Sequence, residues 1–387
     1  MQTDPQASVI WRRRGMGQAG AAGRPRTITR APRPDLSVVR RTRNYESIQY
    51  LRGISAVMVI FYHAAIQSTA ISGIHVPALG KFGVDIFFVI SGFVMWTGVS
   101  GRATSPTIFL KKRFCRIVPL YWSFTLIAAA VALLMPGLLR STIFDLPHLV
   151  ASLAFIPWVN PAASSVKVIE TLTPVVNPGW TLNFEMLFYV MFASILILPR
   201  YLAFLALALE MATLHYVAGL LGGKAPIAQF YAQGVMFEFL FGVAIAIINA
   251  RYRPSLRLVA IGLVSLAVTV LLWADLTQPV ESRWLWLGIP AMAIVAALVG
   301  LENAGWIPRL DWLSRIGAGT YSIYLSHVFV IAATRTVIQM SGAAGWLMQP
   351  LIFVPSAIVA SVGIGMCVHY RVEKPFTAWW TRALGVS

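Results

Sequence analysis

Charged residues are scarce in this sequence. Asp, Glu, Lys and Arg together make up 12% of the 387 residues, against roughly 25% in an ordinary soluble domain. The mean hydropathy is +0.72, and apolar runs long enough to cross a bilayer recur along most of the chain. The sequence therefore predicts a polytopic membrane protein rather than a soluble globular domain.

Other patterns are missing as well. Two cysteines, Cys115 and Cys367, are too few for a disulfide framework or a thiolate metal site. There is no Gly-rich phosphate loop and no metal-ligand spacing, so we expect no bound metal. Ten-residue segments of alternating apolar and polar residues are also missing, which argues against an outer-membrane barrel. We therefore expect an all-α fold.

Positive charge is abundant but confined. The formal net charge is +17, and ten arginines lie in the first 43 residues. Most of the other basic residues flank apolar runs, which is typical of a topology signal rather than of a nucleic-acid-binding face. We interpret residues 1–44, rich in Arg, Pro and Gly, as a disordered basic cytoplasmic tail, and we expect no nucleic-acid partner.

Eleven apolar segments are candidates for membrane helices. They lie at 48–66, 82–99, 118–135, 148–159, 180–198, 201–221, 228–248, 256–274, 284–301, 317–338 and 347–369. The run 148–159 has 12 residues and contains Pro157, so it is too short to span and is interpreted as re-entrant or interfacial. The basic flanks then predict about ten transmembrane helices with both termini cytoplasmic, and 377–387 as a short cytoplasmic tail.

The segment that organises the chain is ESIQYLRGISAVMVIFYHA, residues 46–64, because it carries both Arg52 and His63. Eleven residues of α-helix make three turns to within about 20° and rise about 16 Å, which places both side chains on one face. An ionisable group on a membrane helix suggests function. Alternatively, Arg52 is an anchor at the inner interface and His63 a hydrogen bond between helices.

Further polar residues interrupt the other apolar segments. Asp85 lies near the outer end of 82–99, where it can reach His63 if the first two helices form a hairpin. Such a pair would make His63 a base, because the carboxylate supports the imidazolium. Glu210, His215, Gln233 and Glu238 belong to no motif. The aromatic residues near segment ends, Trp284 and Trp286 among them, are interpreted as ordinary interface belts.

Four cations lie in the six residues KKRFCR, 111–116. They are either a positive-inside signal or a binding site for a polyanionic ligand, since arginine forks match phosphate geometry.

The residues at these positions resemble the acyltransferase-3 family of membrane acyltransferases. Arg52 and His63 match its R-x10-H signature, and FGVDIFFVISGF, residues 82–93, is similar to its second-helix block. Arg113 and Arg116 match its R-x-x-R loop motif.

Three later blocks extend the resemblance. NPGWTLNFEMLFY (177–189) is similar to the family's W-[ST]-L-x-x-E block, and GAGTYSIYLSH (317–327) to its S-Y-x-I-Y-L-x-H block, with Thr320 where Ser is common. VEKP (372–375) resembles the closing E-x-P. The blocks cover about residues 45–376, which we interpret as one transmembrane domain similar to ExoZ-type exopolysaccharide acetyltransferases.

This resemblance implies an O-acetyltransferase of the bacterial inner membrane. It would move acetyl from cytoplasmic acetyl-CoA, its co-substrate, to a sugar hydroxyl of an exported polysaccharide or lipid-linked precursor. Arg113 and Arg116 would hold the CoA phosphates together with Arg52. His63 would be the general base oriented by Asp85, or would itself carry the acetyl group. The residues expected near the acceptor are Trp180, Glu185, Tyr324, His327 and Glu373, the last three by motif alone.

The residue pattern alone leaves other functions open. Transporters also place carboxylate and histidine relays inside membranes, so a proton-coupled transporter or flippase of glycan intermediates is the main alternative. A helical scaffold subunit of an exopolysaccharide machine is another.

Overall fold

The computed structural model describes most of the chain after the basic tail. The described residues are 45–74, 79–99, 104–136, 142–163, 171–222, 225–252, 257–275, 283–342 and 344–386. All of them belong to one compact unit, Thr42–Ser387. The tail 1–44, predicted to be disordered, lies outside the described residues.

The described part of the chain is helical and contains no strand, as predicted. The long helices are α1 (Glu46–Ser72), α2 (Phe82–Val99), α3 (Pro106–Leu134), α6 (Trp180–Ser194), α7 (Arg200–Leu221), α9 (Phe237–Tyr252), α10 (Arg257–Asp275), α11 (Ile289–Asn303), α13 (Thr320–Met340) and α15 (Pro350–Val368). The short helices are α4 (Leu146–Leu153), α8 (Pro226–Tyr231), α12 (Asp311–Ala318), α14 (Ala344–Leu347) and α16 (Lys374–Ala383). The remaining turns are the 3-10 segments η1 (Leu79–Lys81), η2 (Asn177–Gly179), η3 (Ile195–Ile197) and η4 (Gly234–Met236), and the π-helical segments η6 (Trp284–Gly288) and η7 (His369–Glu373).

Nine helices within the described ranges are long and apolar enough to cross a membrane. The predicted segment 256–274 forms one further helix, α10, of 19 residues. Many large apolar side chains stay exposed on these helices, including Leu134, Leu209 and Leu351 at 77%, 68% and 91%. Such exposure would be unusual on a water-soluble protein and is expected where lipid covers a helix. The chain is a multi-pass membrane protein, while the sides on which its termini lie stay a prediction.

Two predicted segments take a definite form. The run 148–159 contains the last six residues of the eight-residue helix α4 and is not among the nine spans. Its backbone then turns at Phe155, which has a φ of 58°. The C-terminal stretch predicted as a tail is mostly helix α16, whose Trp380 ring lies 5.8 Å from the Phe114 ring of α3.

Helices α2 and α9 cross with their backbones in contact. A Cβ atom added to Gly92 would lie 1.9 Å from the Phe239 carbonyl oxygen, and one added to Gly242 would lie 1.9 Å from the Val89 carbonyl oxygen. Small residues at a helix crossing allow this close approach. Only glycine fits at either position, so the two glycines fix the register of α2 against α9.

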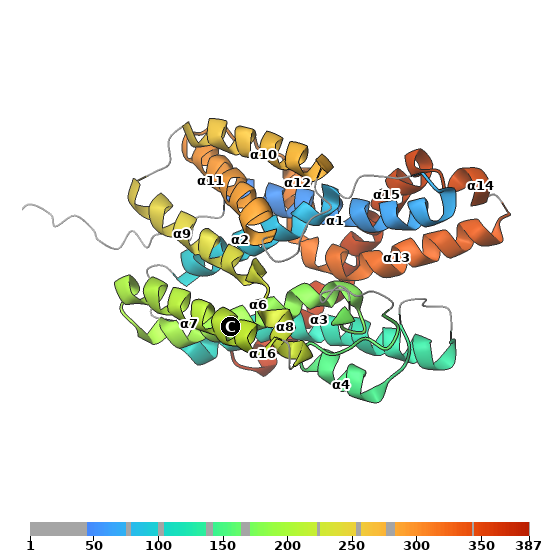
Figure 1. Ribbon diagram of the computed structural model, residues 1–387, viewed down its shortest axis with the longest axis horizontal. Helices are drawn as coiled ribbons and strands as arrows, with labels where there is room; N and C mark the ends of the chain where they lie inside the picture. The colour runs from blue at the N-terminus through green and yellow to red at the C-terminus, as the bar shows by residue number, and fades with distance from the viewer. Residues whose placement is uncertain are drawn as a thin grey trace, which may run out of the picture. The chain divides into compact units, whose positions relative to one another are not determined.

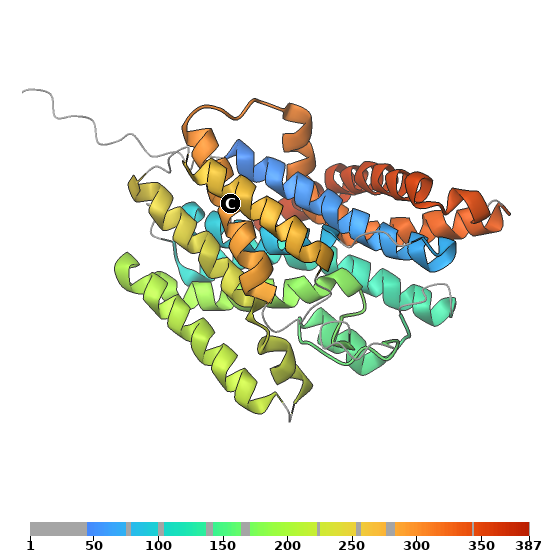
Figure 2. The ribbon, with the colours of Figure 1, turned by 45° about the horizontal axis from the view of Figure 1, so that its top comes forward.

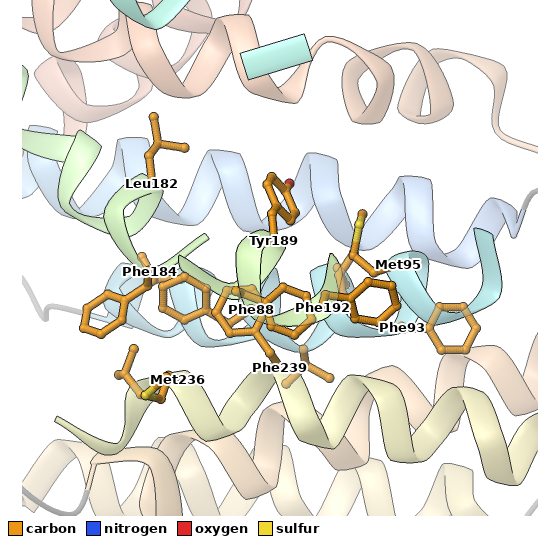
Figure 3. Packing of buried hydrophobic residues seen from close by; sticks show 14 of the residues in the cluster. Phe88, Phe93, Met95, Leu182, Phe184, Tyr189, Phe192, Met236 and Phe239 are labelled. Atoms are coloured by element: carbon orange, nitrogen blue, oxygen red, sulfur yellow. The ribbon is translucent and has the colours of Figure 1, made fainter. Parts of the chain in front are cut away.

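Buried aromatic rings fill the space where α2, α6 and α9 meet (Figure 3). Phe88 of α2 and Phe188 of α6 both lie against Phe239 of α9, with ring centroids 4.8 Å and 4.3 Å away. All three side chains are at most 3% exposed. This packing holds α6, with Glu185, at a fixed position beside α2, with Asp85.

Helix α1 lies beside α13 and α15 (Figures 1 and 2). Its first turn is capped by a distant residue, because the Glu302 carboxylate at the end of α11 accepts hydrogen bonds from the backbone amides of Glu46 and Ser47, at 3.1 and 2.8 Å. A carboxylate at a helix N-terminus satisfies free amides and complements the helix dipole. The start of α1, six residues before Arg52, is therefore fixed to the C-terminal half of the chain.

We predict that the α2–α9 crossing is intolerant of a single methyl group. Gly92→Ala should lower the thermal unfolding midpoint of the purified protein in detergent, because overpacking of this kind costs about 1–3 kcal/mol. Gly98→Ala, in the same helix, is the matched control. No atom of the described residues lies within 4 Å of its added Cβ, so its midpoint should be unchanged or raised. Equal midpoints for the two variants would contradict the described crossing.

Candidate active site

Arg52, on α1, stands among charged residues from three other elements. Its Nη1 donates to the Gln49 side chain at 3.2 Å, and the charges of Arg116, Glu373 and Glu185 act on its guanidinium. Arg116 comes from α3, Glu185 from α6 and Glu373 from η7. These residues, with Arg113, are called the arginine cluster below. It unites every residue predicted to bind CoA phosphate with two of those predicted near the acceptor.

Aromatic rings support the cluster on the side of α3. The Arg113 guanidinium lies over the rings of Phe109 and Tyr189, 5.4 and 5.7 Å from their centroids. The Tyr189 hydroxyl donates in turn to the Glu185 carboxylate, one helical turn earlier on α6. Arg113 and Glu185 are thus held on either side of one tyrosine.

Glu373 ties two helices together. Its Oε2 accepts a hydrogen bond from the Ser322 hydroxyl of α13 at 2.6 Å and one from Nδ1 of His369 at 2.7 Å. The residue is 7% exposed. These contacts fix the first turn of α13 against η7, and a direct contact between Glu373 and substrate stays a prediction.

His63 pairs with His327 of α13. Nδ1 of His63 lies 2.9 Å from the Val59 carbonyl oxygen and 3.2 Å from Nε2 of His327. Nδ1 of His327 lies 2.6 Å from the Tyr324 carbonyl oxygen. We call His63 and His327 the histidine pair. Two residues assigned from separate sequence blocks, 264 positions apart, therefore meet in one place.

The carbonyl contacts decide where the protons are. A carbonyl oxygen only accepts hydrogen bonds, so Nδ1 carries the hydrogen in each of the two imidazoles. Nε2 of His327 then has a lone pair directed at the Nδ1 hydrogen of His63. Nε2 of His63 has a lone pair too, and it makes no hydrogen bond to the described residues. His63 is thereby prepared to accept a proton or to attack a carbonyl carbon through Nε2.

The expected contact between Asp85 and His63 is wrong. Asp85, fully buried in α2, accepts two hydrogen bonds from Arg283, one from Nε at 2.9 Å and one from Nη2 at 2.8 Å. Nη2 also donates to the Lys81 carbonyl at 3.2 Å. The planar arginine fork matches both carboxylate oxygens at once, which a single imidazole N–H cannot do. The residue that orients His63 is therefore His327.

Trp180 and Tyr324 both pack against phenylalanine rings of α2, Phe88 and Phe87 respectively. The Trp180 ring packs edge-on against Phe88 and Phe184, with centroids 6.3 and 6.2 Å away. The Tyr324 hydroxyl donates to the Pro178 carbonyl at 3.0 Å and contacts the Thr181 hydroxyl at 2.9 Å. Tyr324 thus ties α13 to the start of α6, while contacts of either residue with substrate stay a prediction.

A family model described as an acyltransferase domain matches residues 45–370. The chain belongs to the acyltransferase-3 family. It is accordingly a membrane-embedded acyltransferase. The match includes Arg52, His63, Asp85 and His327 and ends three residues before Glu373.

Two curated relatives match this chain over nearly their whole length. The exopolysaccharide production protein ExoZ of Rhizobium meliloti is 32% identical over 333 residues, which cover 82% of this chain and 94% of that protein. The acyltransferase MdmB of Streptomyces mycarofaciens is 26% identical over 373 residues, which cover 85% of this chain and 90% of that protein. No solved structure matches the chain.

Arg283 is the site residue of this acyltransferase that the sequence reasoning missed. It comes just before an apolar segment and reads as an ordinary flanking charge. The predicted topology nevertheless puts it at an outer helix end, where basic residues are disfavoured. That departure from the positive-inside pattern is the signal that could have identified it.

We predict strong coupling between Asp85 and Arg283. Either Asp85→Asn or Arg283→Gln alone leaves a buried charge without its counterion, which typically costs about 3–5 kcal/mol. The double variant should recover a large part of the loss in thermal stability, measured as a double-mutant cycle in detergent. Strictly additive losses would contradict the ion pair.

Proposed function

We propose that this acyltransferase moves an acetyl group from acetyl-CoA to a sugar hydroxyl of an exported polysaccharide or its lipid-linked precursor, in the bacterial inner membrane. The observation that carries the proposal is that one helix, α1, contributes a residue to each group: Arg52 belongs to the arginine cluster, and His63, eleven residues later, belongs to the histidine pair. The first group suits a phosphorylated donor, and the second suits proton transfer at a hydroxyl. The name of the relative ExoZ supports a glycan acceptor.

The donor binds at the arginine cluster in this proposal. Arg113 and Arg116 lie half-buried on α3, beside the exposed Lys111 and Lys112. Guanidinium groups bind phosphate oxygens through paired, charge-assisted hydrogen bonds. The basic segment 111–116 is predicted to face the cytoplasm, where acetyl-CoA is made. With its phosphates here, the extended pantetheine arm would carry the thioester along α1 toward His63.

The histidine pair performs the chemistry. Nε2 of His63 removes the proton of the sugar hydroxyl as that oxygen attacks the thioester carbonyl carbon. The carbon–sulfur bond then breaks, and the CoA thiolate takes the proton from Nε2. Throughout the reaction, Nε2 of His327 accepts a hydrogen bond from the Nδ1–H of His63. This bond holds the orientation of the His63 ring and supports its imidazolium form.

A two-step route uses the same atoms. Nε2 of His63 attacks the thioester carbonyl carbon, the carbon–sulfur bond breaks, the CoA thiolate leaves, and an acetyl-imidazolium that keeps its Nδ1 hydrogen forms. The sugar hydroxyl then attacks the acetyl carbon, the carbon–nitrogen bond breaks, and the hydroxyl proton passes to the freed Nε2. Nε2 releases this proton to solvent, which balances the thiolate that left in the first step, and so regains its lone pair. This route would let donor and acceptor occupy the site in turn.

We expect His63→Ala to abolish acetylation. His327→Ala should lower kcat by about 10²-fold or more, the range for loss of a group that supports a general base. A deletion strain is complemented with each variant at equal expression, and its surface glycan is measured by mass spectrometry. Each acetyl group adds about 42 Da to the glycan, as its C₂H₂O composition dictates. His215→Ala, an intramembrane histidine on α7, is the control and should acetylate normally. Acetylation by His63→Ala would exclude the proposed mechanism, and loss of glycan export with acetylation intact would indicate a transporter.

The donor assignment predicts a split between two substrates. Arg113→Ala or Arg116→Ala should raise the KM for acetyl-CoA about tenfold or more, because a hydrogen bond between charged groups contributes roughly 1.5–3 kcal/mol. The KM for acetyl-pantetheine, which lacks the nucleotide phosphates, should change little. Lys112→Ala, at the exposed neighbour, is the matched control. Equal effects on both donors would place the CoA phosphates elsewhere.

A further inference from the structure

Two buried polar side chains have no part in the chemistry described so far. Glu238 is fully buried at the start of α9, and Gln233 is 8% exposed just before η4. Among the described residues, neither amide atom of Gln233 has a hydrogen-bond partner, and neither carboxyl oxygen of Glu238 is bonded by a nitrogen or hydroxyl donor. The Glu238 carboxyl group instead faces the carboxylate of Asp85. Buried polar groups are nearly always satisfied, because leaving each one unpaired costs about 1–3 kcal/mol. Two such groups five residues apart therefore require an explanation.

A glycine lies opposite the Glu238 side chain on the facing element, η6. Gly288, the last residue of the π-helical turn η6, lies against it, and a Cβ atom at Gly288 would come 2.8 Å from Cγ of Glu238. The charges of Asp85 and Arg283 also act on Glu238. Two carboxyl groups therefore share the neighbourhood of one arginine, whose charge is already matched by Asp85.

An aromatic ring forms the wall beside Gln233. The Trp284 ring lies so close to Gly234 that a Cβ atom there would be 2.1 Å from Cδ1 of the indole. The same ring is 5.3 Å from the ring of Phe237. Trp284 is thus packed against the start of α9, and its place at the membrane interface stays a prediction.

This group of residues adjoins the histidine pair. Arg283, already bound to Asp85, donates to the Lys81 carbonyl, and the Lys81 ammonium lies 5.1 Å from the centroid of the Tyr62 ring. The Tyr62 ring in turn lies 5.1 Å from that of His63. Arg283 also acts electrostatically on Tyr324, three residues before His327.

We propose that Gln233 and Glu238, with Trp284 as a wall, form a subsite for the hydroxyl groups of the acceptor sugar. This inference rests on the proposed function, since it names where that acceptor binds. A carboxylate and an amide supply the paired donors and acceptors that neighbouring sugar hydroxyls match, and a few convergent polar groups in an apolar surround are typical of a ligand site. The Asp85–Arg283 ion pair forms the rigid floor between this subsite and the histidine pair.

The proposal separates binding from stability. Gln233→Leu removes amide atoms that have no hydrogen-bond partner among the described residues, and Glu238→Leu removes a buried carboxyl group that faces another carboxylate. The thermal unfolding midpoint should therefore stay unchanged or rise. The same variants should raise the KM for the acceptor at least tenfold, with the KM for acetyl-CoA within twofold of wild type. The acceptor probe is the glycan and lipid-linked glycan extract of a strain that lacks this gene, and radiolabelled acetyl-CoA reports transfer by the full-length protein.

Two matched controls complete the experiment. Gln229→Leu changes an exposed glutamine on α8, and Glu210→Leu changes a glutamate on α7 that binds the Ser194 hydroxyl; both should retain the wild-type acceptor KM. An acceptor KM within twofold of wild type for both test variants overturns the subsite and leaves the proposed function standing. A lower midpoint with both KM values raised means a structural role and overturns it as well. Failure of the wild-type protein to acetylate the extract defeats the proposed function, and this inference with it.

Discussion

Lipid cannot solvate a charge, and this constraint organises the polar residues of the whole bundle. A charged side chain left facing hydrocarbon costs about 2.5–3.5 kcal/mol even on insertion scales. Asp85 and Glu238 are accordingly fully buried within the protein, and the charged groups of α1, α3, α6 and η7 gather in one cluster. Because each of these contacts joins different helices, the polar groups also fix how the apolar helices pack, which lipid-facing surfaces alone specify weakly.

The same constraint explains why a histidine suits His63 as a partner. A carboxylate beside His63 would add a permanent charge to a buried site before any substrate arrives. Neutral His327 offers only a lone pair at 3.2 Å, so the resting pair carries no net charge. Positive charge then appears only when His63 accepts a proton, and it is shared with the second ring. Asp85, by contrast, has its charge matched by Arg283 at 2.8 Å.

Regular features of the chain were predictable because they depend on local periodicity. The positions of the long helices follow from apolar runs, and the shared face of Arg52 and His63 follows from helical geometry. The pairing of Asp85 was not predictable, because Arg283 lies 198 residues away and nothing in the local pattern of either residue indicates the other. Proximity along the chain favoured His63 instead. The sequence shows that Glu238 and Gln233 are polar residues that are costly to bury in a membrane helix. Their neighbours follow only from the packing of η6 against α9.

The cap on α1 has a consequence for the order in which the protein is assembled. Helix α1 is made before the other helices described here, yet the carboxylate that holds its first turn is Glu302, and the partner of its histidine is residue 327. A nascent chain that has not yet passed these positions lacks both contacts. The paired imidazoles therefore form only after residue 327 has been made, so α1 alone does not carry the arrangement.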